Sequence, residues 1–318
     1  MDRRCLYCYE PLASGEGDFH RKCSRKMFGT SLPPLLPYDE NQLDELALEV
    51  IRSQTAITGV QPKLSLHLEP AGKAHAPQRF TIVGLWGGYI LKPPSQRFRQ
   101  LPEIEDLTMR MAEAARIDTV PHSLIRMRSG ALAYVTRRID RTGKGKLHME
   151  DMCQITGRLT ENKYHGSYEQ IAKAIHRYSA NPGLDVINFF EVVLFCFLSG
   201  NADMHLKNFS LIDIEAKGGY SLAPAYDLVS TGLVMPSDKE DLALTLDGKK
   251  KKITLNDFRA AFGELTIDEV VQERMFRKFR NVLPLWDLLI EKSFLDHENQ
   301  AAYKELIRKK CHQIRLDA

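Results

Sequence analysis

An almost continuous apolar segment that ends in a polar loop is the feature that most constrains this chain. Residues 186–198 carry Glu191 as their only charge. At that length the segment predicts a buried helix rather than a strand. The loop 200–211 that follows is rich in Asp, His, Lys and Asn, and residues 208–214 then alternate like a short strand. Holding a polar loop between two buried elements costs desolvation free energy, so the pattern predicts a functional site.

Within this loop, Asp203 and Asn208 have the D-x-x-x-x-N spacing of a kinase catalytic loop. There the Asp accepts the proton of the acceptor hydroxyl and the Asn amide oxygen holds magnesium. A second carboxylate, Asp227, closes the loop 223–227, where a metal-binding Asp is expected. Asp and Asn are also common turn residues, and either one alone favours that interpretation. The joint pattern predicts phosphoryl transfer.

A lysine upstream fits the same chemistry. The strand expected over 89–92 ends in Lys92, just before two prolines. A strand lysine contacts the ATP phosphates in kinases, although an exposed lysine at a strand end is the commoner case. The helix expected over 102–117 offers Glu103 and Glu105 either as partners for this lysine or as favourable first-turn charges.

A polar loop centred on Thr58 and Gly59 leads past Lys63 into a strand with leucines at alternate positions. It is either a lid over a triphosphate or, as the residues alone favour, the plain start of a hairpin. The chain has no Walker motif.

Composition bounds the remaining possibilities. The chain has 318 residues, of which 43% are hydrophobic and 27% charged, enough for two lobes with substantial cores. A net charge of +3 does not indicate a nucleic-acid binder. We expect a cytoplasmic protein, because no secretory signal is visible and the apolar segment is too short and interrupted to span a bilayer. The six cysteines suit a reducing compartment better than a disulfide scaffold.

Near the N-terminus, Cys5, Cys8, His20 and Cys23 form the pattern C-x2-C-x11-H-x2-C. Two close pairs separated by a loop are typical of a tetrahedral zinc knuckle. A small buried thiol cluster explains the residues equally well, so both interpretations stay open. A metal here would be structural and would take no part in the chemistry.

We therefore expect three parts. Residues 1–37 form the cysteine knuckle with a proline-rich connector, residues 38–138 an N-terminal lobe, and residues 139–318 a mostly helical C-terminal lobe. The expected helices are 39–52, 102–117, 150–155, 168–178, 186–198, 256–262, 269–281 and 283–294, and the expected strands are 64–68, 80–83, 89–92, 131–139 and 208–214.

Five segments together resemble the HipA family of bacterial serine/threonine kinase toxins: residues 58–63, 90–93, 150–154, 200–211 and 222–227. The resemblance implies a two-lobed, protein-kinase-like α/β (α+β) fold, with a β-sheet in the N-terminal lobe and a mostly helical C-terminal lobe. It implies ATP and Mg²⁺ as cofactors. It also implies Asp203 as catalytic base, Asn208 and Asp227 as magnesium ligands, Lys92 as phosphate-binding lysine, and nucleotide contacts from Thr58, Gly59, Val60, Gln61, Lys63, Arg137, Ile139, His205 and Lys207.

Two departures from the family pattern refine these expectations. The match to full-length HipA begins late, a layout similar to the HipT-type kinases of three-component HipBST toxin–antitoxin systems, whose separate HipS protein resembles the absent subdomain. In addition, Ala56 stands where the family has an autophosphorylated serine. Thr58 is then the nearest remaining candidate, followed by Thr55 and Ser53.

The resemblance implies an aminoacyl-tRNA synthetase as the phosphorylated substrate, with the tryptophanyl enzyme favoured over the glutamyl one. It implies a HipS-like partner and a HipB-like DNA-binding antitoxin, without direct binding of nucleic acid or membrane. Two alternatives stay open: a small-molecule phosphotransferase, and a nucleotide-binding pseudokinase that transfers nothing.

Overall fold

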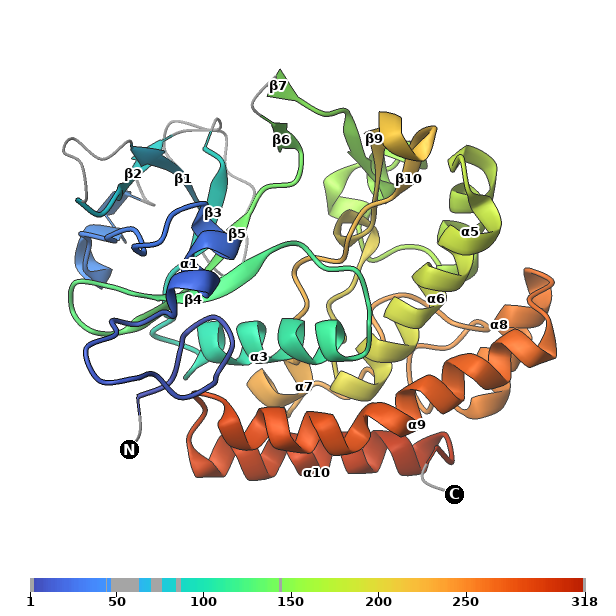
Figure 1. Ribbon diagram of the computed structural model, residues 1–318. Helices are drawn as coiled ribbons and strands as arrows, with labels where there is room; N and C mark the ends of the chain where they lie inside the picture. Colours follow the sequence, from blue (N-terminus) through green and yellow to red (C-terminus); the bar gives the residue numbers. More distant parts are fainter. Residues whose placement is uncertain are drawn as a thin grey trace. The chain divides into compact units, whose positions relative to one another are not determined.

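The chain folds into two compact units in a computed structural model that describes residues 3–43, 45–46, 63–69, 76–83, 87–142 and 145–316 (Figure 1). The first unit comprises residues 1–106, 120–139 and 292–294. The second comprises residues 107–119, 140–291 and 295–318. Each unit has its own sheet, and each is described separately below.

A five-stranded antiparallel sheet forms the first unit, in the order β2-β1-β3-β5-β4. Alternating side chains of β1 are buried, with Leu64 and Leu66 almost fully enclosed, as the alternating leucines predict. Lys92, the last residue of β3, pairs with Tyr134 of β5. The strands are β1 (Leu64–Glu69), β2 (Arg79–Val83), β3 (Tyr89–Lys92), β4 (His122–Arg126) and β5 (Leu132–Arg137).

The N-terminal segment shares its hydrophobic core with this sheet. Helix α1 (Arg21–Phe28) ends at Gly29, and its last residue, Phe28, packs edge-on against Phe80 of β2 with ring centroids 6.0 Å apart. Phe80 in turn packs edge-on against Tyr89 of β3 at 5.1 Å. The cysteine-rich segment is therefore built into the first unit.

Helix α3 (Leu101–Ala114) carries buried charged residues near its start. Its residues up to Asp106 belong to the first unit and those from Leu107 to the second. The helix was expected over 102–117; instead it ends earlier, with Arg116 in a left-handed conformation at φ 57°. Of the helix expected over 39–52, residues 40–43 and 45–46 are helical and the remainder lies outside the described residues.

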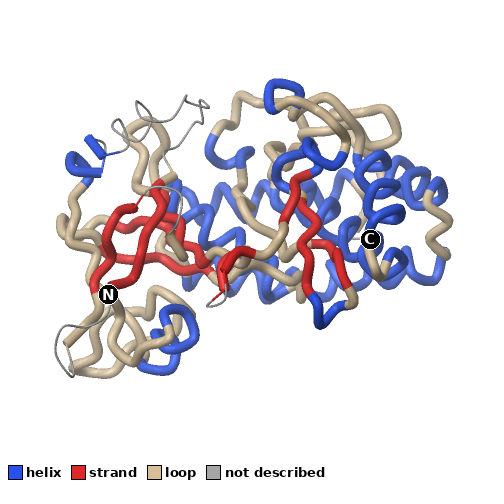
Figure 2. Tube along the Cα trace, turned by 90° about the horizontal axis from the view of Figure 1, so that it is seen from above, coloured by secondary structure: helices blue, strands red, loops and turns tan. Residues whose placement is uncertain are grey.

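Helices dominate the second unit, around a three-stranded antiparallel sheet in the order β10-β9-β8 (Figure 2). A short hairpin, β6 (Arg141–Thr142) and β7 (Gly145–Lys146), precedes the sheet. The remaining elements are β8 (Met149–Asp151), α4 (Met152–Ile155), α5 (Tyr168–Tyr178), α6 (Pro182–Ser199), β9 (Ser210–Ile214), β10 (Gly219–Leu222), α7 (Thr231–Val234), α8 (Leu255–Glu264), α9 (Glu269–Lys292) and α10 (His297–Gln313).

The predicted apolar helix is α6. Pro182 occupies its first turn, and Gly200 ends it in a left-handed conformation whose N–H donates to the carbonyls of Cys196 and Phe197. By length and composition α6 is long and apolar enough to cross a membrane, so the expectation that it is too short was wrong. Because 67% of this span is buried inside the protein, we interpret it as a core helix.

Two expectations for the second unit were wrong, and one helix was missed. Helix α9 is continuous where two helices were expected, with Pro284 inside it. Beyond this proline the helix is held by the buried Trp286, whose indole N–H donates to the Met111 carbonyl at 2.8 Å. The helix expected over 150–155 begins only at Met152, because Glu150 and Asp151 belong to β8. Helix α10 was not predicted, because its buried stripe consists only of Tyr303, Ile307 and Cys311.

We predict that Gly200→Ala destabilises the protein by about 1–2 kcal/mol, because an alanine is strained at φ 68°. The new Cβ would also lie 2.6 Å from Leu306 Cδ2, but this is the end of a side chain that can move. Chemical denaturation measures the change. Gly183→Ala is the matched control, since its Cβ meets nothing within 4 Å. If Gly200→Ala costs no stability in a Leu306→Ala background, contact rather than backbone strain causes the loss.

Candidate active site

The polar loop 200–211 is fixed at its start by the first turn of α7. The Gly200 carbonyl accepts a hydrogen bond from the Gly232 N–H at 2.8 Å. The hydroxyl of Thr231 accepts from the Ala202 N–H at 2.8 Å and donates to the Gly200 carbonyl at 3.3 Å. The backbone that leads to Asp203 is therefore anchored before the carboxylate is reached.

Asp203 and Asn208 are joined through the backbone. The Asp203 carbonyl accepts from the His205 N–H at 2.9 Å and from the Asn208 side-chain amide, Nδ2, at 3.0 Å. The Asp203 N–H donates to Asn201 Oδ1 at 3.0 Å, which orients the residue from the other side. Because the Asn208 amide nitrogen is engaged, Oδ1 is the atom through which this side chain would hold a metal.

Tyr226 fixes the end of the loop. Its hydroxyl donates to the Lys207 carbonyl at 3.1 Å and bonds the Ser210 hydroxyl at 2.5 Å. Burial raises the pKa of Tyr226, so the hydroxyl remains a donor. Asp227 follows directly, in a left-handed conformation at φ 57°. Backbone strain of this kind is concentrated at functional sites, and here it sits on the predicted metal ligand.

The pKa of His205 is influenced by burial and by the carboxylates of Asp203 and Asp227. Burial lowers its pKa to about 4, against the opposing effects of Asp203 and Asp227, both of which favour the charged imidazole. Its Nδ1 has no hydrogen-bond partner within the part of the chain that the structure describes. The ring packs edge-on against Tyr164, with centroids 4.9 Å apart. At neutral pH His205 is therefore an uncharged, buried ring.

Tyr164 is a site residue that the sequence did not reveal. Its hydroxyl donates to Asp203 Oδ1 at 2.5 Å, although the two residues are 39 positions apart. Burial and the neighbouring carboxylate both raise the pKa of Tyr164, so it stays protonated. One oxygen of the predicted base is thereby occupied and the carboxylate orientation is set. No local pattern around Tyr164 could have indicated this contact.

Lys207 forms an ion pair with Asp151 at 2.6 Å. Asp151 also begins α4, where its side chain accepts from the Gln154 N–H and the Gln154 side chain accepts from the Asp151 N–H. The family-like segment 150–154 therefore holds the loop lysine in place.

Lys92 in the first unit is buried, with 4% of its surface exposed, and is paired with the buried Glu105 of α3. Its ammonium lies 5.5 Å from the centre of the Tyr134 ring. The expectation that a glutamate of this helix steadies the lysine is confirmed for Glu105, and the alternative of an exposed strand-end lysine was wrong. A buried ion pair contributes little net stability, so its presence favours a functional role.

Of the other predicted nucleotide contacts, Arg137, Ile139 and Lys63 lie within the described residues. Arg137 ends β5 and donates its N–H to the Pro121 carbonyl at 2.8 Å, and Ile139 is the last residue of this stretch of the first unit. Lys63 is exposed just before β1. Thr58, Gly59, Val60 and Gln61 lie outside the described residues, so the lid stays a prediction.

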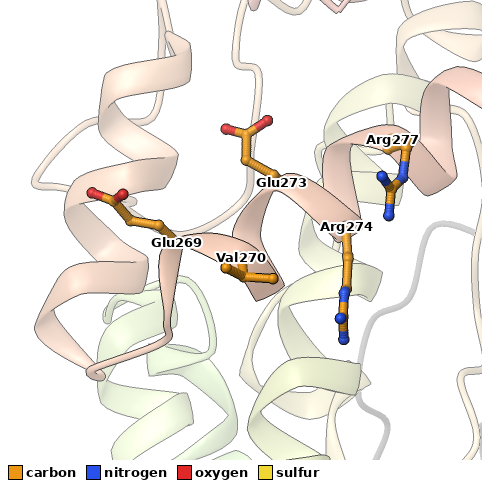
Figure 3. A pocket seen from close by; sticks show the side chains of 5 residues that line it. All are labelled: Glu269, Val270, Glu273, Arg274 and Arg277. Atoms are coloured by element: carbon orange, nitrogen blue, oxygen red, sulfur yellow. The ribbon is translucent and has the colours of Figure 1, made fainter.

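A surface pocket over the first turns of α9 is lined by Glu269, Val270, Glu273, Arg274 and Arg277 (Figure 3). These side chains are exposed, and Glu273 is paired with Arg259 at 2.7 Å. None of them belongs to the loop 200–211 or to residues 223–227. We interpret this pocket as part of a solvated charged face.

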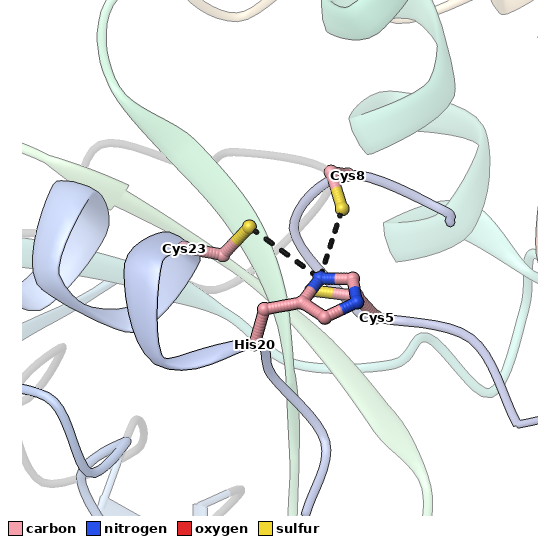
Figure 4. A group of neighbouring side chains, drawn as sticks. All are labelled: Cys5, Cys8, His20 and Cys23. Atoms are coloured by element: carbon pink, nitrogen blue, oxygen red, sulfur yellow. Dashed lines mark hydrogen bonds between the residues drawn. The ribbon is translucent and has the colours of Figure 1, made fainter. Parts of the chain in front are cut away.

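The four predicted zinc ligands come together in the first unit. The ligand atoms of Cys5, Cys8, His20 and Cys23 all lie within 4.8 Å of one another, and Figure 4 shows the side chains converging on one point. Cys5 and Cys23 are buried, while Cys8 and His20 are partly exposed.

We predict that His205 makes the protein sensitive to acid. Its pKa is lowered in the folded state, so between about pH 6.5 and about 4 the unfolded chain binds a proton that the folded chain does not. Neutral His205 therefore does not lower the free energy of unfolding above pH 6.5. As the pH is decreased from about 6.5 to about 4, this free energy decreases by about 1.4 kcal/mol per pH unit. Unfolding in magnesium-free buffer should show a shallower decline for His205→Gln and an unchanged one for the exposed His176→Gln. Equal declines in His205→Gln and wild type would contradict the assignment.

Comparison with known proteins places this chain in a family. The model of the HipA-like C-terminal domain matches residues 55–286. A putative kinase, Y4dM, of Sinorhizobium fredii is 31% identical over 234 residues, covering 69% of this chain and 55% of the relative. The serine/threonine-protein kinase toxin HipA of Shewanella oneidensis is 27% identical over 216 residues, covering 62% of this chain and 47% of the toxin. The chain thus spans about half the length of these relatives.

The fold is also that of a solved structure. HipA in the complex of HipA, HipB and operator DNA from Shewanella oneidensis superposes with a TM-score of 0.70 at 21% identity, covering 89% of this chain and 72% of HipA. The predicted two-lobed, kinase-like α/β fold is confirmed. On the family match over residues 55–286, the chain belongs to the family defined by the HipA-like C-terminal domain.

Proposed function

We propose that this protein is an ATP- and magnesium-dependent serine/threonine protein kinase that acts as the toxin of a toxin–antitoxin system. The observation that carries the proposal is the loop in which Asn208 bonds the Asp203 carbonyl at 3.0 Å while Thr231 and Tyr226 fix its two ends. Asp227 directly follows Tyr226 in the chain. This is the order and chemistry of a base and two metal ligands in phosphoryl transfer.

The donor set suits magnesium. The Asn208 amide oxygen and the Asp227 carboxylate are hard oxygen ligands, which Mg²⁺ prefers over nitrogen or sulfur. When bound there, the ion would neutralise the charge that develops on the phosphoryl oxygens.

The protein side chains would bind the nucleotide phosphates, orient the acceptor hydroxyl and take its proton. The γ-phosphoryl group passes from ATP to the acceptor hydroxyl oxygen, ADP leaves, and the hydroxyl proton goes to the Asp203 carboxylate. Tyr164 holds Asp203 Oδ1, which leaves Oδ2 to meet the acceptor. Lys92, held by Glu105, supplies a positive charge for the nucleotide phosphates. His205, neutral and buried, shapes the loop without exchanging protons at neutral pH.

The substrate and partners rest on family resemblance. An aminoacyl-tRNA synthetase, the tryptophanyl enzyme before the glutamyl one, is the proposed acceptor, in the cytoplasm. A HipB-like antitoxin is supported by the presence of HipB in the complex that contains the structural neighbour. A HipS-like protein is the proposed second partner. Thr58 is the proposed site of regulatory autophosphorylation.

Labelled ATP, magnesium and cell lysate test the proposal. We expect one labelled protein band besides the kinase. Asp203→Ala and Asp227→Ala should each lower the rate at least about a thousandfold, the effect of removing several kcal/mol of transition-state stabilisation. Both variants should remain folded, with a cooperative thermal transition.

Asp213→Ala is the matched control, because it removes a partly buried carboxylate from β9 of the same unit and should retain full activity. Label found only in small molecules would instead favour a phosphotransferase. Full activity in a folded Asp203→Ala protein would contradict the catalytic assignment.

A further inference from the structure

We propose that Cys5, Cys8, His20 and Cys23 bind one zinc ion, and that the knuckle closed by this ion positions Glu105 for its pair with Lys92. The metal site stands on its own geometry, whereas its consequence for nucleotide binding rests on the proposed function. The four ligands and Tyr9 are assigned no contact with nucleotide or substrate, so we treat them as positioning residues.

The distances between the ligand atoms suit a tetrahedral zinc ion. His20 Nδ1 lies 3.4 Å from Cys8 Sγ and 3.7 Å from Cys23 Sγ (Figure 4). Zinc bonds of about 2.3 Å to sulfur and about 2.0–2.1 Å to nitrogen place tetrahedral ligands about 3.5–3.8 Å apart. The two spacings to His20 need almost no adjustment for an ion at the centre, and the other ligand atoms also lie within 4.8 Å of one another.

The tautomer of His20 also favours a metal. Its Nε2 lies 3.0 Å from the Pro11 carbonyl oxygen, so this nitrogen carries the hydrogen and donates. Nδ1 then presents its single lone pair to the sulfurs. A backbone carbonyl that fixes the outer nitrogen of a histidine is the usual arrangement around a metal-bound imidazole.

The alternative of a thiol cluster explains this less well. Two thiols, those of Cys8 and Cys23, face the one lone pair of His20 Nδ1, which can accept only one well-formed hydrogen bond. A cation that receives electron pairs from all the ligands removes this conflict. The turn that carries the first two cysteines is closed by backbone bonds, Tyr9 N–H to the Cys5 carbonyl and Cys5 N–H to the Glu10 carbonyl, both 2.9 Å long.

Tyr9 connects this turn to helix α3. It directly follows Cys8, adopts a left-handed conformation at φ 63°, and is buried with 1% of its surface exposed. Its hydroxyl donates to Asp106 Oδ2 at 2.7 Å, and its ring packs edge-on against Phe294. The other carboxylate oxygen, Oδ1, bonds His122 Nδ1 of β4, also at 2.7 Å. The knuckle is thus joined to α3 by a fully buried polar contact.

Asp106 is connected to the Lys92–Glu105 ion pair in two ways. Its neighbour on α3 is Glu105, the partner of Lys92. In addition, the rings of His122 and Tyr134 stack with centroids 5.9 Å apart, and the Lys92 ammonium lies 5.5 Å from the centre of the same Tyr134 ring. The atoms from Tyr9 to Lys92 are almost completely buried, so a displacement of Tyr9 cannot be absorbed by solvent.

Loss of the zinc ion should therefore disturb the Lys92–Glu105 ion pair. Without zinc the Cys5–Cys8 turn has no central bond, and the strained backbone of Tyr9 is free to relax. Asp106 then loses a buried donor, and the start of α3 loses its contact with the knuckle. Glu105 is expected to hold Lys92 less precisely, which would weaken the binding of nucleotide phosphates.

Metal analysis of protein purified without chelator tests the site. We expect one zinc per chain in the wild type and less than a tenth in Cys8→Ser. Less than a tenth in the wild type would overturn the metal assignment, because structural zinc sites are tight. Cys311→Ser, which removes a buried cysteine of the second unit, should retain full zinc.

Tyr9→Phe tests the link while leaving the four ligands in place. Amide hydrogen exchange over residues 101–106 should accelerate about tenfold, with zinc content unchanged. Tyr7→Phe is the matched control: this ring is also buried, beneath Lys26, and lies in the same turn. Unchanged exchange in Tyr9→Phe would overturn the link whether or not the protein is a kinase.

Nucleotide binding separates positioning from general destabilisation. Tyr9→Phe should raise the Kd of a fluorescent ATP analogue about tenfold. In a Glu105→Gln background, Tyr9→Phe should add less than a twofold change, because the pair it positions is already broken. Equal effects in both backgrounds would overturn the route through Glu105. Failure of the wild type to bind nucleotide would overturn the proposed function. The metal site and the link through Tyr9 would then still be tested by zinc content and hydrogen exchange.

Discussion

The burial of helix α6 determines where the candidate active site can be. Phe189, Phe190, Phe195 and Phe197 are completely enclosed, and each such side chain stabilises the fold by about 1.5–3 kcal/mol. This stabilisation exceeds the cost of presenting a polar loop at the helix end. Because Gly200 ends α6 in a left-handed conformation, the chain turns directly into the segment that carries Asp203.

Several side chains with predicted roles in phosphoryl transfer are held at a cost to stability. Asp227 has a left-handed backbone, His205 is buried and uncharged, and Lys92 and Glu105 form a buried ion pair. Each feature is unfavourable or close to neutral in free energy when considered alone. Their occurrence in segments that match a kinase pattern indicates that they are retained for function.

Local sequence patterns predicted what depends on local physics. The apolar run gave α6 nearly its observed bounds, and the D-x-x-x-x-N spacing correctly grouped Asp203 with Asn208, since both lie in one short loop. Helix α10 was missed because its apolar stripe is narrow, and the continuity of α9 because proline usually ends a helix.

The contacts that orient the site could not be predicted, because they join distant parts of the chain. Tyr164 meets Asp203 across 39 positions, and Tyr9 meets Asp106 across 97. A single tyrosine gives no periodicity or spacing from which such a partner could be inferred. The Lys92–Glu105 pair was foreseen, since kinase-like chemistry predicts an acidic partner for the strand lysine and the next helix offers two glutamates.

The position of the metal in the nucleotide-bound protein tests the phosphoryl-transfer assignment most directly. We expect a crystal of the protein with manganese and a non-hydrolysable ATP analogue to show an anomalous peak about 2.0–2.3 Å from both Asn208 Oδ1 and an Asp227 carboxylate oxygen. The phosphate chain of the analogue should contact the same ion. A nucleotide bound with its metal away from both residues would contradict the assignment of this loop as the catalytic centre.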